Sequence, residues 1–494
     1  MTKLGSFMAG AMLALAGAAA ATSASAETAC ADLAAKVLPH AQVTAATVES
    51  VGQSQACKIS VTSKPTPQSD IRIEVWIPLG AAWNGKYVQL GNGGFAGTIP
   101  SGQIKAMAAR GYAAAGTDDG HQSAVGTSGS WALGDHEKFV DFGWRALKET
   151  TDAAKALIAA QKGSGAKQAY FYGCSDGGRE ALMEAQRYPK DFDGVVAGAP
   201  AYSMSRLFGL GAAIDQALVK PDGYLGADQR AVLQSAALAQ CGDGGFIHDP
   251  MSCRFDPAAL QCKAGQDASK CLTSAQVASA KVIYGGLRDP RSGALITQGY
   301  SPGAESLGPS WPLWLTGATR EGLSNSLIYG FVSNAFKYFA FDDPSYDILK
   351  LDLGAEFARA RAKMAPTLDS TNPDLSAFRA HGGKLIQYHG WNDPAIPPRE
   401  SIVYYEDVGR KMGRTDSFYR LYVVPGMLHC GGGPGPSNVD WLALLDTWVG
   451  SGARPGEVTA TGGGQASQVL CPYPSAARRS GSQASYSCST PKKR

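Results

Sequence analysis

The sequence predicts an α/β fold, in which a mostly parallel sheet forms the core and a large domain is inserted into it. Two observations lead to this prediction. Strand-like and helix-like patterns alternate over residues 71–200, and the alternation returns over residues 382–452. Between them, residues 203–375 show no sustained hydrophobic period. Alternating strands and helices are typical of a parallel sheet covered on both faces, so the interruption indicates an insertion.

The first part of the predicted core covers residues 27–202. Runs of branched residues that alternate with polar ones favour strands, and longer runs with helical spacing favour helices. In order, we expect a strand at 71–79, a strand and glycine-rich loop at 87–97, a helix, strand and loop at 106–121, a long helix at 140–163, and a strand, sharp turn, helix and strand at 168–200.

The inserted domain is predicted at residues 203–375, where aromatic residues, glycine–proline turns and four cysteines are scattered. A chain of 494 residues is long enough for two such units. The core resumes at 376–494, with strands that run into loops at 382–398 and 417–436 and a closing helix at 439–452. The tail after Gly462 is polar and disordered in character, apart from its two cysteines.

Residues 1–26 are predicted to be a secretory signal peptide. Lys3 precedes an apolar stretch from about Phe7 to Ala21, and a small-x-small cleavage site ends at Ala26. The alternative is a buried N-terminal helix. No later segment is apolar for long enough to span a membrane. A net charge of +3 argues against nucleic-acid binding. We therefore expect a periplasmic or secreted protein without nucleic-acid or membrane partners.

All ten cysteines follow the predicted cleavage site, and an even number in an exported protein favours disulfides. Zinc binding is the alternative, but the chain has no CxxC pair. Sequence alone leaves the pairing open. Eight cysteines fall into neighbouring pairs, and Cys174 and Cys430 remain; the neighbours are Cys30 with Cys57, Cys241 with Cys253, Cys262 with Cys271, and Cys471 with Cys488.

Ser175 is the candidate nucleophile because it lies in a G-x-S-x-G motif between a predicted strand and a predicted helix. Glycines beside the serine permit the sharp turn that projects a nucleophile from the edge of a sheet. A helix N-cap serine is the alternative. A serine nucleophile needs a base and an acid that orients the base.

The candidate acid and base are Asp393 and His429, which follow the two late strands in the chain order Ser, Asp, His. His389 and His381 are competitors for the base, although His389, at the end of a strand, is better suited to packing or to tying a loop. His121 follows another strand and could line the site.

The oxyanion of a tetrahedral intermediate needs two fixed N–H donors. We expect the amide of Asp176, the residue after the nucleophile, to be one donor. The glycine-rich loop at 91–97 would supply the other through Gly94, with Gly93 as the near alternative. A plain glycine turn is the other interpretation of this loop.

Cys174 precedes the candidate nucleophile, and Cys430 follows the candidate base. If Ser175 and His429 meet, their neighbours must also lie close together. A disulfide between Cys174 and Cys430 would then hold the nucleophile turn against the histidine loop. Two unrelated buried thiols are the alternative.

Three segments together resemble the tannase and feruloyl esterase family: GCSDGG, YHGWNDPAIPP and PGMLHCGGGPGP. The similarity extends over nearly all of the chain after residue 26. It implies an α/β-hydrolase core with an inserted lid, a triad of Ser175, Asp393 and His429, and the Cys174–Cys430 disulfide. It also implies hydrolysis of gallate, hydroxycinnamate or mono(2-hydroxyethyl) terephthalate esters.

The chain departs from this family in its lid. Members usually carry an aspartate-rich calcium loop after a cysteine, whereas Cys241 is followed only by GDGGFIHDPMSC. Asp243 and Asp249 remain, which is few ligands for an ion that takes six to eight oxygens. We therefore expect no cofactor and no metal, with calcium doubtful.

The sequence favours a serine esterase of the feruloyl esterase type, which acts on small aromatic esters derived from plant cell walls or polyphenols. Tannase or mono(2-hydroxyethyl) terephthalate hydrolase activity, peptide cleavage and a catalytically silent binding protein are the alternatives. Trp314 and Arg320 are candidate substrate contacts, Arg320 for an acidic ring substituent, and further aromatic walls could come from Trp311, Tyr329, Phe331 and Phe336.

Overall fold

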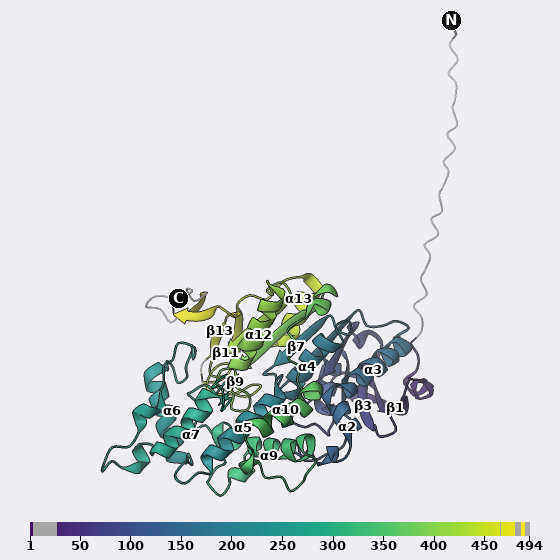
Figure 1. The fold of residues 1–494 in the computed structure, drawn as a ribbon. Coiled ribbons are helices and arrows are strands. Elements are labelled where there is room, and N and C mark those ends of the chain that lie inside the picture. The colour runs from purple at the N-terminus through teal and green to yellow at the C-terminus, as the bar shows by residue number, and fades with distance from the viewer. Residues whose placement is uncertain (3–26, 465, 480–485, 490–494) are drawn as a thin grey trace.

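A nine-stranded sheet crosses the centre of the computed structural model, which describes residues 1–2, 27–464, 466–479 and 486–489 (Figure 1). The predicted signal peptide, residues 1–26, lies almost entirely outside the described residues. No helix in the described part of the chain is long and apolar enough to cross a membrane.

The sheet has the strand order β1-β2-β3-β5-β4-β6-β7-β10-β11. The first three strands pair antiparallel, and β3 also pairs antiparallel with β5; they are β1 (Ala41–Val51), β2 (Ser54–Ser63) and β3 (Ile71–Pro78). The other six run parallel: β5 (Ala113–Thr117), β4 (Lys86–Leu90), β6 (Gln168–Cys174), β7 (Gly194–Gly198), β10 (Lys384–Gly390) and β11 (Tyr419–Val424). The loops after the parallel strands therefore meet at one edge.

Helices cover both faces of the sheet, as the alternating pattern predicts. On β10, Leu385 belongs to an apolar cluster with residues of α3 and α4. Its neighbour Ile386 belongs to a second cluster, with residues of α1 and α13. Successive strand side chains point to opposite faces, so both faces are buried. The core helices are α1 (Ser101–Ala109), α2 (His136–Val140), α3 (Ala146–Lys162), α4 (Asp176–Arg187), α11 (Ser376–Ala380), α12 (Arg399–Met412) and α13 (Trp441–Ser451).

The chain between β7 and β10 forms a largely helical unit beside the sheet (Figure 1). The sequence pattern there did not predict these helices. Gly211 permits close packing of α5 on α9, because an added Cβ would lie 2.5 Å from Val332 Cγ2. The unit contains α5 (Met204–Leu218), α6 (Ala227–Cys241), α7 (Ser274–Gly285), α8 (Trp311–Trp314), α9 (Leu327–Asn334), α10 (Ala355–Leu368), β8 (Leu287–Arg288) and β9 (Leu295–Thr297).

The insertion packs on the core through a continuous apolar cluster. Phe95 from the glycine-rich loop makes edge-to-face contacts with Phe142 of the core and with Phe331 and Phe339 of the insertion. Aromatic pairs of this geometry add stability beyond the burial of their area. The glycine-rich loop is therefore held between core and insertion.

The C-terminal tail is more ordered than its polar composition predicted. Four short strands form two hairpins: β12 (Val458–Thr461) with β13 (Ser467–Leu470), and β14 (Ala476–Arg479) with β15 (Tyr486–Ser489). The amide of Tyr473 donates to the carbonyl of Leu421 on β11, which attaches the tail to the edge of the sheet.

The structure contains five disulfides, and each joins two cysteines that the sequence analysis paired: Cys30–Cys57, Cys174–Cys430, Cys241–Cys253, Cys262–Cys271 and Cys471–Cys488. Four of them close short loops. Cys174–Cys430 instead spans 256 residues and joins the two parts of the core. Disulfides of this number fit an oxidising compartment.

Candidate active site

Ser175 lies in the turn between β6 and α4, with φ 67° and ψ −123°. A positive φ is costly for a residue with a side chain and is typical of a strained nucleophile turn. The turn is tight: a Cβ on Gly173 would lie 2.2 Å from the carbonyl oxygen of Gly177. Only glycine at these positions allows the chain to fold back so closely. Ser175 is therefore presented at the edge of the sheet.

Asp393 and His429 come from the loops after β10 and β11 and form a hydrogen bond. His429 Nδ1 lies 2.8 Å from Asp393 Oδ2. The Asp393 side chain is fully buried, whereas 12% of the His429 side chain remains exposed. An imidazole held by a buried carboxylate, with its other face open, has the geometry of a base that an acid orients.

The Asp393 carboxylate is strongly favoured over its protonated form. Burial raises the pKa of this group, but the charge of His429 and hydrogen bonds from two histidines outweigh burial and bring the pKa well below its usual range. The backbone amides of Ala395 and Ile396 also donate to Oδ1, at 2.7 and 3.0 Å. A carboxylate with several donors stays ionised.

The Cys174–Cys430 disulfide links the serine turn to the histidine loop. Its Cα atoms lie 6.0 Å apart, and each cysteine is the direct neighbour of Ser175 or His429. Trp314 of the insertion packs edge-on against His429, with ring centroids 5.0 Å apart. The serine turn, the histidine loop and the insertion are thus held together at one edge of the sheet.

The glycine-rich loop after β4 is held against the start of α4. The amide of Gly177 donates to the carbonyl of Asn92 at 2.7 Å, and the amide of Asn92 donates to Glu180 Oε2 at 2.9 Å. Gly94 and Asp176 line the same cavity as Ser175, whereas Gly93 is exposed. This position suits Gly94 and Asp176 as the two candidate amide donors.

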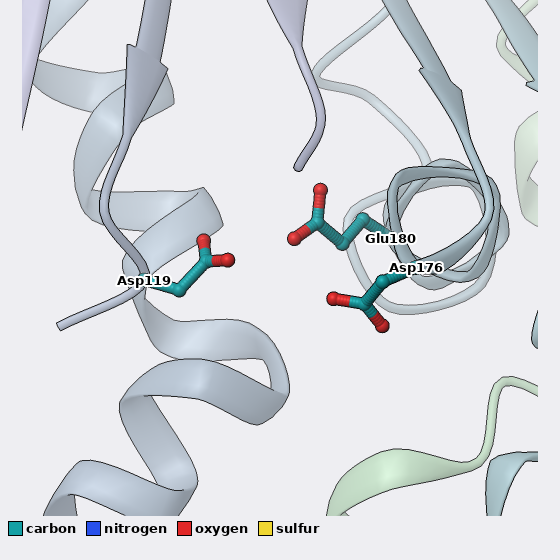
Figure 2. A group of neighbouring side chains, drawn as sticks. All are labelled: Asp119, Asp176 and Glu180. Carbon is teal, nitrogen blue, oxygen red and sulfur yellow. The ribbon is translucent and has the colours of Figure 1, made fainter. Parts of the chain in front are cut away.

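Three buried carboxyl groups lie behind this loop and point toward one another: Asp119 after β5, and Asp176 and Glu180 on α4 (Figure 2). Asp176 pairs with Arg179, which lies 2.5 Å away. The side-chain amide of Asn92 donates to Asp119 Oδ2 at 2.9 Å. The sequence analysis assigned a role only to the backbone amide of Asp176; it assigned none to Asp119, to Glu180 or to the three carboxyl groups.

The carboxyl groups of Asp119 and Glu180 lie within 4.8 Å of each other, and the neighbouring Arg179 forms its ion pair with Asp176. Burial, followed by the charges of neighbouring carboxylates, raises the pKa of both groups, and that of Glu180 to about 7. One proton between two carboxyl groups resolves the repulsion of two like charges. Near neutral pH this pair is therefore partly protonated, whereas Asp393 is ionised.

A narrow, almost wholly apolar cavity opens beside Ser175. Trp314 and Phe331 line it, as predicted for aromatic walls from the lid. Trp311 and Phe336 instead pack inside the insertion, and Tyr329 lies at its edge. The lining residues are Gly94, Phe95, Ser175, Asp176, Ala201, Met204, Leu207, Phe208, Trp314, Ile328, Phe331, Val332, Ala395 and Ile396.

Arg320 and two of the other histidines lie away from the reacting atoms. Arg320 is exposed and does not line this cavity, so the structure does not bring it to the predicted position. His381 is also exposed, near Asp193. His121 is buried, stacks on Trp131 with ring centroids 3.9 Å apart, and contacts the carbonyl of Phe95. Burial lowers the pKa of His121 to about 4, so it is a neutral packing residue.

The doubt about calcium at the shortened lid loop stays a prediction. Asp243 and Asp249 lie in the loop that the Cys241–Cys253 disulfide closes. Calcium takes six to eight oxygen ligands, so nothing in the proposed chemistry is assigned to a metal.

The fold and the serine turn define an α/β-hydrolase. Comparison with known proteins agrees: the chain matches the family described as tannase and feruloyl esterase over residues 56–491. It is similar to an uncharacterized esterase of Xanthomonas campestris, with 35% identity over 91% of this chain and 88% of the relative. A mono(2-hydroxyethyl) terephthalate hydrolase of Piscinibacter sakaiensis is 31% identical over 85% of this chain and 82% of that protein.

Among solved structures, feruloyl esterase B from Aspergillus oryzae superposes with a TM-score of 0.84 and 26% identity, covering 93% of this chain and 99% of that one. This chain therefore belongs to the tannase and feruloyl esterase family, and it is a carboxylic ester hydrolase.

Proposed function

We propose that this protein is an exported serine esterase that hydrolyses esters of aromatic carboxylic acids through a Ser175–His429–Asp393 triad. One observation carries the proposal: the Cys174–Cys430 disulfide joins the strained serine turn to the histidine that Asp393 orients. A link between two loops more than 250 residues apart in sequence supports Ser175 as the nucleophile and His429 as its base.

The reaction follows from these positions. Ser175 Oγ attacks the ester carbonyl carbon while His429 Nε2 accepts the serine proton, and the amides of Gly94 and Asp176 stabilise the oxyanion. The bond to the alcohol oxygen then breaks, and His429 returns the proton to that oxygen. Water attacks the acyl-enzyme by the same route, which releases the acid and restores Ser175.

The cavity beside Ser175 supports an aromatic acyl group. Its walls are aliphatic and aromatic side chains, including Phe95, Phe208, Trp314 and Phe331, and such walls bind a flat apolar ring through burial and ring contacts. Two relatives are named a mono(2-hydroxyethyl) terephthalate hydrolase and a feruloyl esterase, and both names describe aromatic acyl groups. Substrates derived from plant cell walls or polyphenols would supply such esters. Five disulfides support action outside the cytoplasm.

An ester panel tests the proposal. Purified protein is assayed on methyl ferulate, methyl gallate, mono(2-hydroxyethyl) terephthalate, a p-nitrophenyl alkanoate and a peptide amide, beside Ser175→Ala. The matched control is Ser54→Ala, at the exposed start of β2. We expect turnover of an aromatic ester that Ser175→Ala abolishes and Ser54→Ala preserves. Turnover that survives in Ser175→Ala, or a fluorophosphonate that fails to label Ser175, would contradict the proposal.

A further inference from the structure

A second histidine contacts the Asp393 carboxylate. His389, at the end of β10, is fully buried, and its Nε2 lies 3.1 Å from Asp393 Oδ2, the same oxygen that His429 Nδ1 contacts at 2.8 Å. The triad described above does not use this residue, and the sequence analysis treated it as a competitor of His429 or a loop-tying residue.

The contacts of His389 determine where its proton lies. Nε2 faces two acceptors, the carboxylate of Asp393 at 3.1 Å and the carbonyl of Ile396 at 3.1 Å, so this nitrogen carries the hydrogen. Nδ1 lies 2.7 Å from Ser401 Oγ on α12. A neutral imidazole has one donor and one acceptor nitrogen, so the Ser401 hydroxyl donates to Nδ1.

We propose that His389 is a positioning residue for the esterase reaction: its Nε2–H, which donates to the carbonyl of Ile396, also faces Asp393 Oδ2 at 3.1 Å and holds the carboxylate in the orientation that His429 requires. This inference rests on the proposed function. With His389 in place, both oxygens of Asp393 are held, Oδ1 by the amides of Ala395 and Ile396 and Oδ2 by two imidazoles.

His389 also ties the acid loop to α12. Its contacts reach Ile396, which lines the cavity, and Ser401 on the helix. Two ionisable groups from other elements adjoin this arrangement: Tyr300 of the insertion donates to the carbonyl of Ala395, and Glu400 of α12 accepts from Tyr202. Burial followed by the charges of Asp393 and Asp215 raises the pKa of Tyr300, so this group stays neutral.

Two substitutions of His389 separate hydrogen bonding from packing. His389→Leu keeps an apolar side chain of similar volume but removes the donor, whereas His389→Gln places an amide N–H near the position of Nε2. We expect His389→Leu to lower kcat about tenfold to a hundredfold, the range for losing a hydrogen bond to a charged group, with KM little changed. His389→Gln should recover most of the loss.

The pH profile provides a readout that packing alone would not move. Without the His389 donor, the negative charge of Asp393 acts more strongly on His429, so the acid limb of the kcat/KM profile should move to higher pH in His389→Leu. Ser401→Ala, which removes only the donor to Nδ1, should give a smaller change of the same sign. The matched control His381→Gln, at an exposed site, should change neither.

The outcomes separate this inference from the function on which it rests. If Ser175→Ala abolishes turnover but His389→Leu keeps the wild-type kcat and pH profile, the positioning role is wrong and the esterase proposal stands. If His389→Leu and His389→Gln lose activity and thermal stability equally, with Ser401→Ala unchanged, His389 is only a packing residue. If Ser175→Ala retains turnover, the proposed function fails by itself.

Discussion

Buried carboxyl groups lie in two parts of the site, Asp393 beside His429 and Glu180 with Asp119 behind the glycine-rich loop, and their ionisation differs. Asp393, on the base side, has a pKa well below its usual range, whereas Glu180, behind the glycine-rich loop, has a pKa of about 7. Burial raises the pKa of both groups. The difference lies in what faces them: two imidazoles and two amides at Asp393, and other carboxyls at Glu180.

Since both groups are fully buried, the surrounding donors and charges, and not depth, decide the charge of these two carboxyls. An ionised Asp393 can stabilise an imidazolium as it forms on His429. The pair of Asp119 and Glu180 carries less negative charge when it is partly protonated. Both carboxyls accept hydrogen bonds from Asn92 and so support the glycine-rich loop. Negative charge is therefore greater at Asp393, beside His429, than at Glu180, behind the glycine-rich loop.

The largest expected effect comes from removing the negative charge of Asp393. Asp393→Asn keeps the shape of the acid but presents an N–H or a weaker acceptor to His429 Nδ1, so kcat should fall by roughly 10³ to 10⁴. The same swap on the other side, Glu180→Gln, should lower kcat by no more than about tenfold, because an amide replaces a largely neutral group. Steady-state kinetics of both variants measures the contrast. Equal losses would show that the two carboxyls are not in different charge states.

Breaking the disulfide between the serine turn and the histidine loop should have the next largest effect. The double variant Cys174→Ser with Cys430→Ser frees a loop of 256 residues, and the free energy of unfolding should fall by about 2–5 kcal/mol. Its kcat should also fall, since the serine turn and the histidine loop can separate. The control is the tail pair, Cys471→Ser with Cys488→Ser, which should leave kcat unchanged. Denaturant titration measures the unfolding free energy, and parallel assays measure kcat. If kcat is unchanged in the Cys174 and Cys430 variant, the disulfide contributes to stability alone.

Removing the acceptor behind the glycine-rich loop should have a smaller effect on stability. Glu180→Leu leaves the buried amide of Asn92 without its partner, which should cost about 1–3 kcal/mol of unfolding free energy. Glu180→Gln retains an acceptor and should cost less. Chemical denaturation of both variants measures the difference. Equal destabilisation by both would mean that the contact to Asn92 contributes nothing.

The smallest expected effect is a change in how stability depends on pH. A carboxyl whose pKa is raised to about 7 in the folded protein binds more protons there than in the unfolded chain, so stability falls as pH rises from about 4.5 to 7. Glu180→Gln removes this contribution, and its unfolding free energy should lose about 1–2 kcal/mol less than wild type over that interval. Asp393 acts in the opposite sense. Its pKa is lowered in the folded protein, so its contribution to the unfolding free energy is present at neutral pH and is lost as the pH falls below about 4. Parallel slopes for the two proteins between pH 5 and 8 would argue against the shared proton.

Local patterns in the sequence predicted much of this arrangement. The G-x-S-x-G turn between a strand and a helix is encoded by neighbouring residues, because only glycine at Gly173 and Gly177 permits the close approach. The short disulfides follow from proximity along the chain. The placement of Asp393 and His429 after strands also followed, since the carboxyl ends of parallel strands share one edge.

The tertiary structure decided what depends on contacts between distant segments. His389 lies at the end of one strand and His429 follows another, and only the tertiary structure shows that His429 stays partly exposed while His389 is buried against Asp393. The insertion forms helices although its pattern predicted none, because its apolar residues pack against one another and against the core. Arg320 lies outside the cavity, and Asp119 meets Glu180, for the same reason: through-space packing places side chains that sequence spacing does not relate.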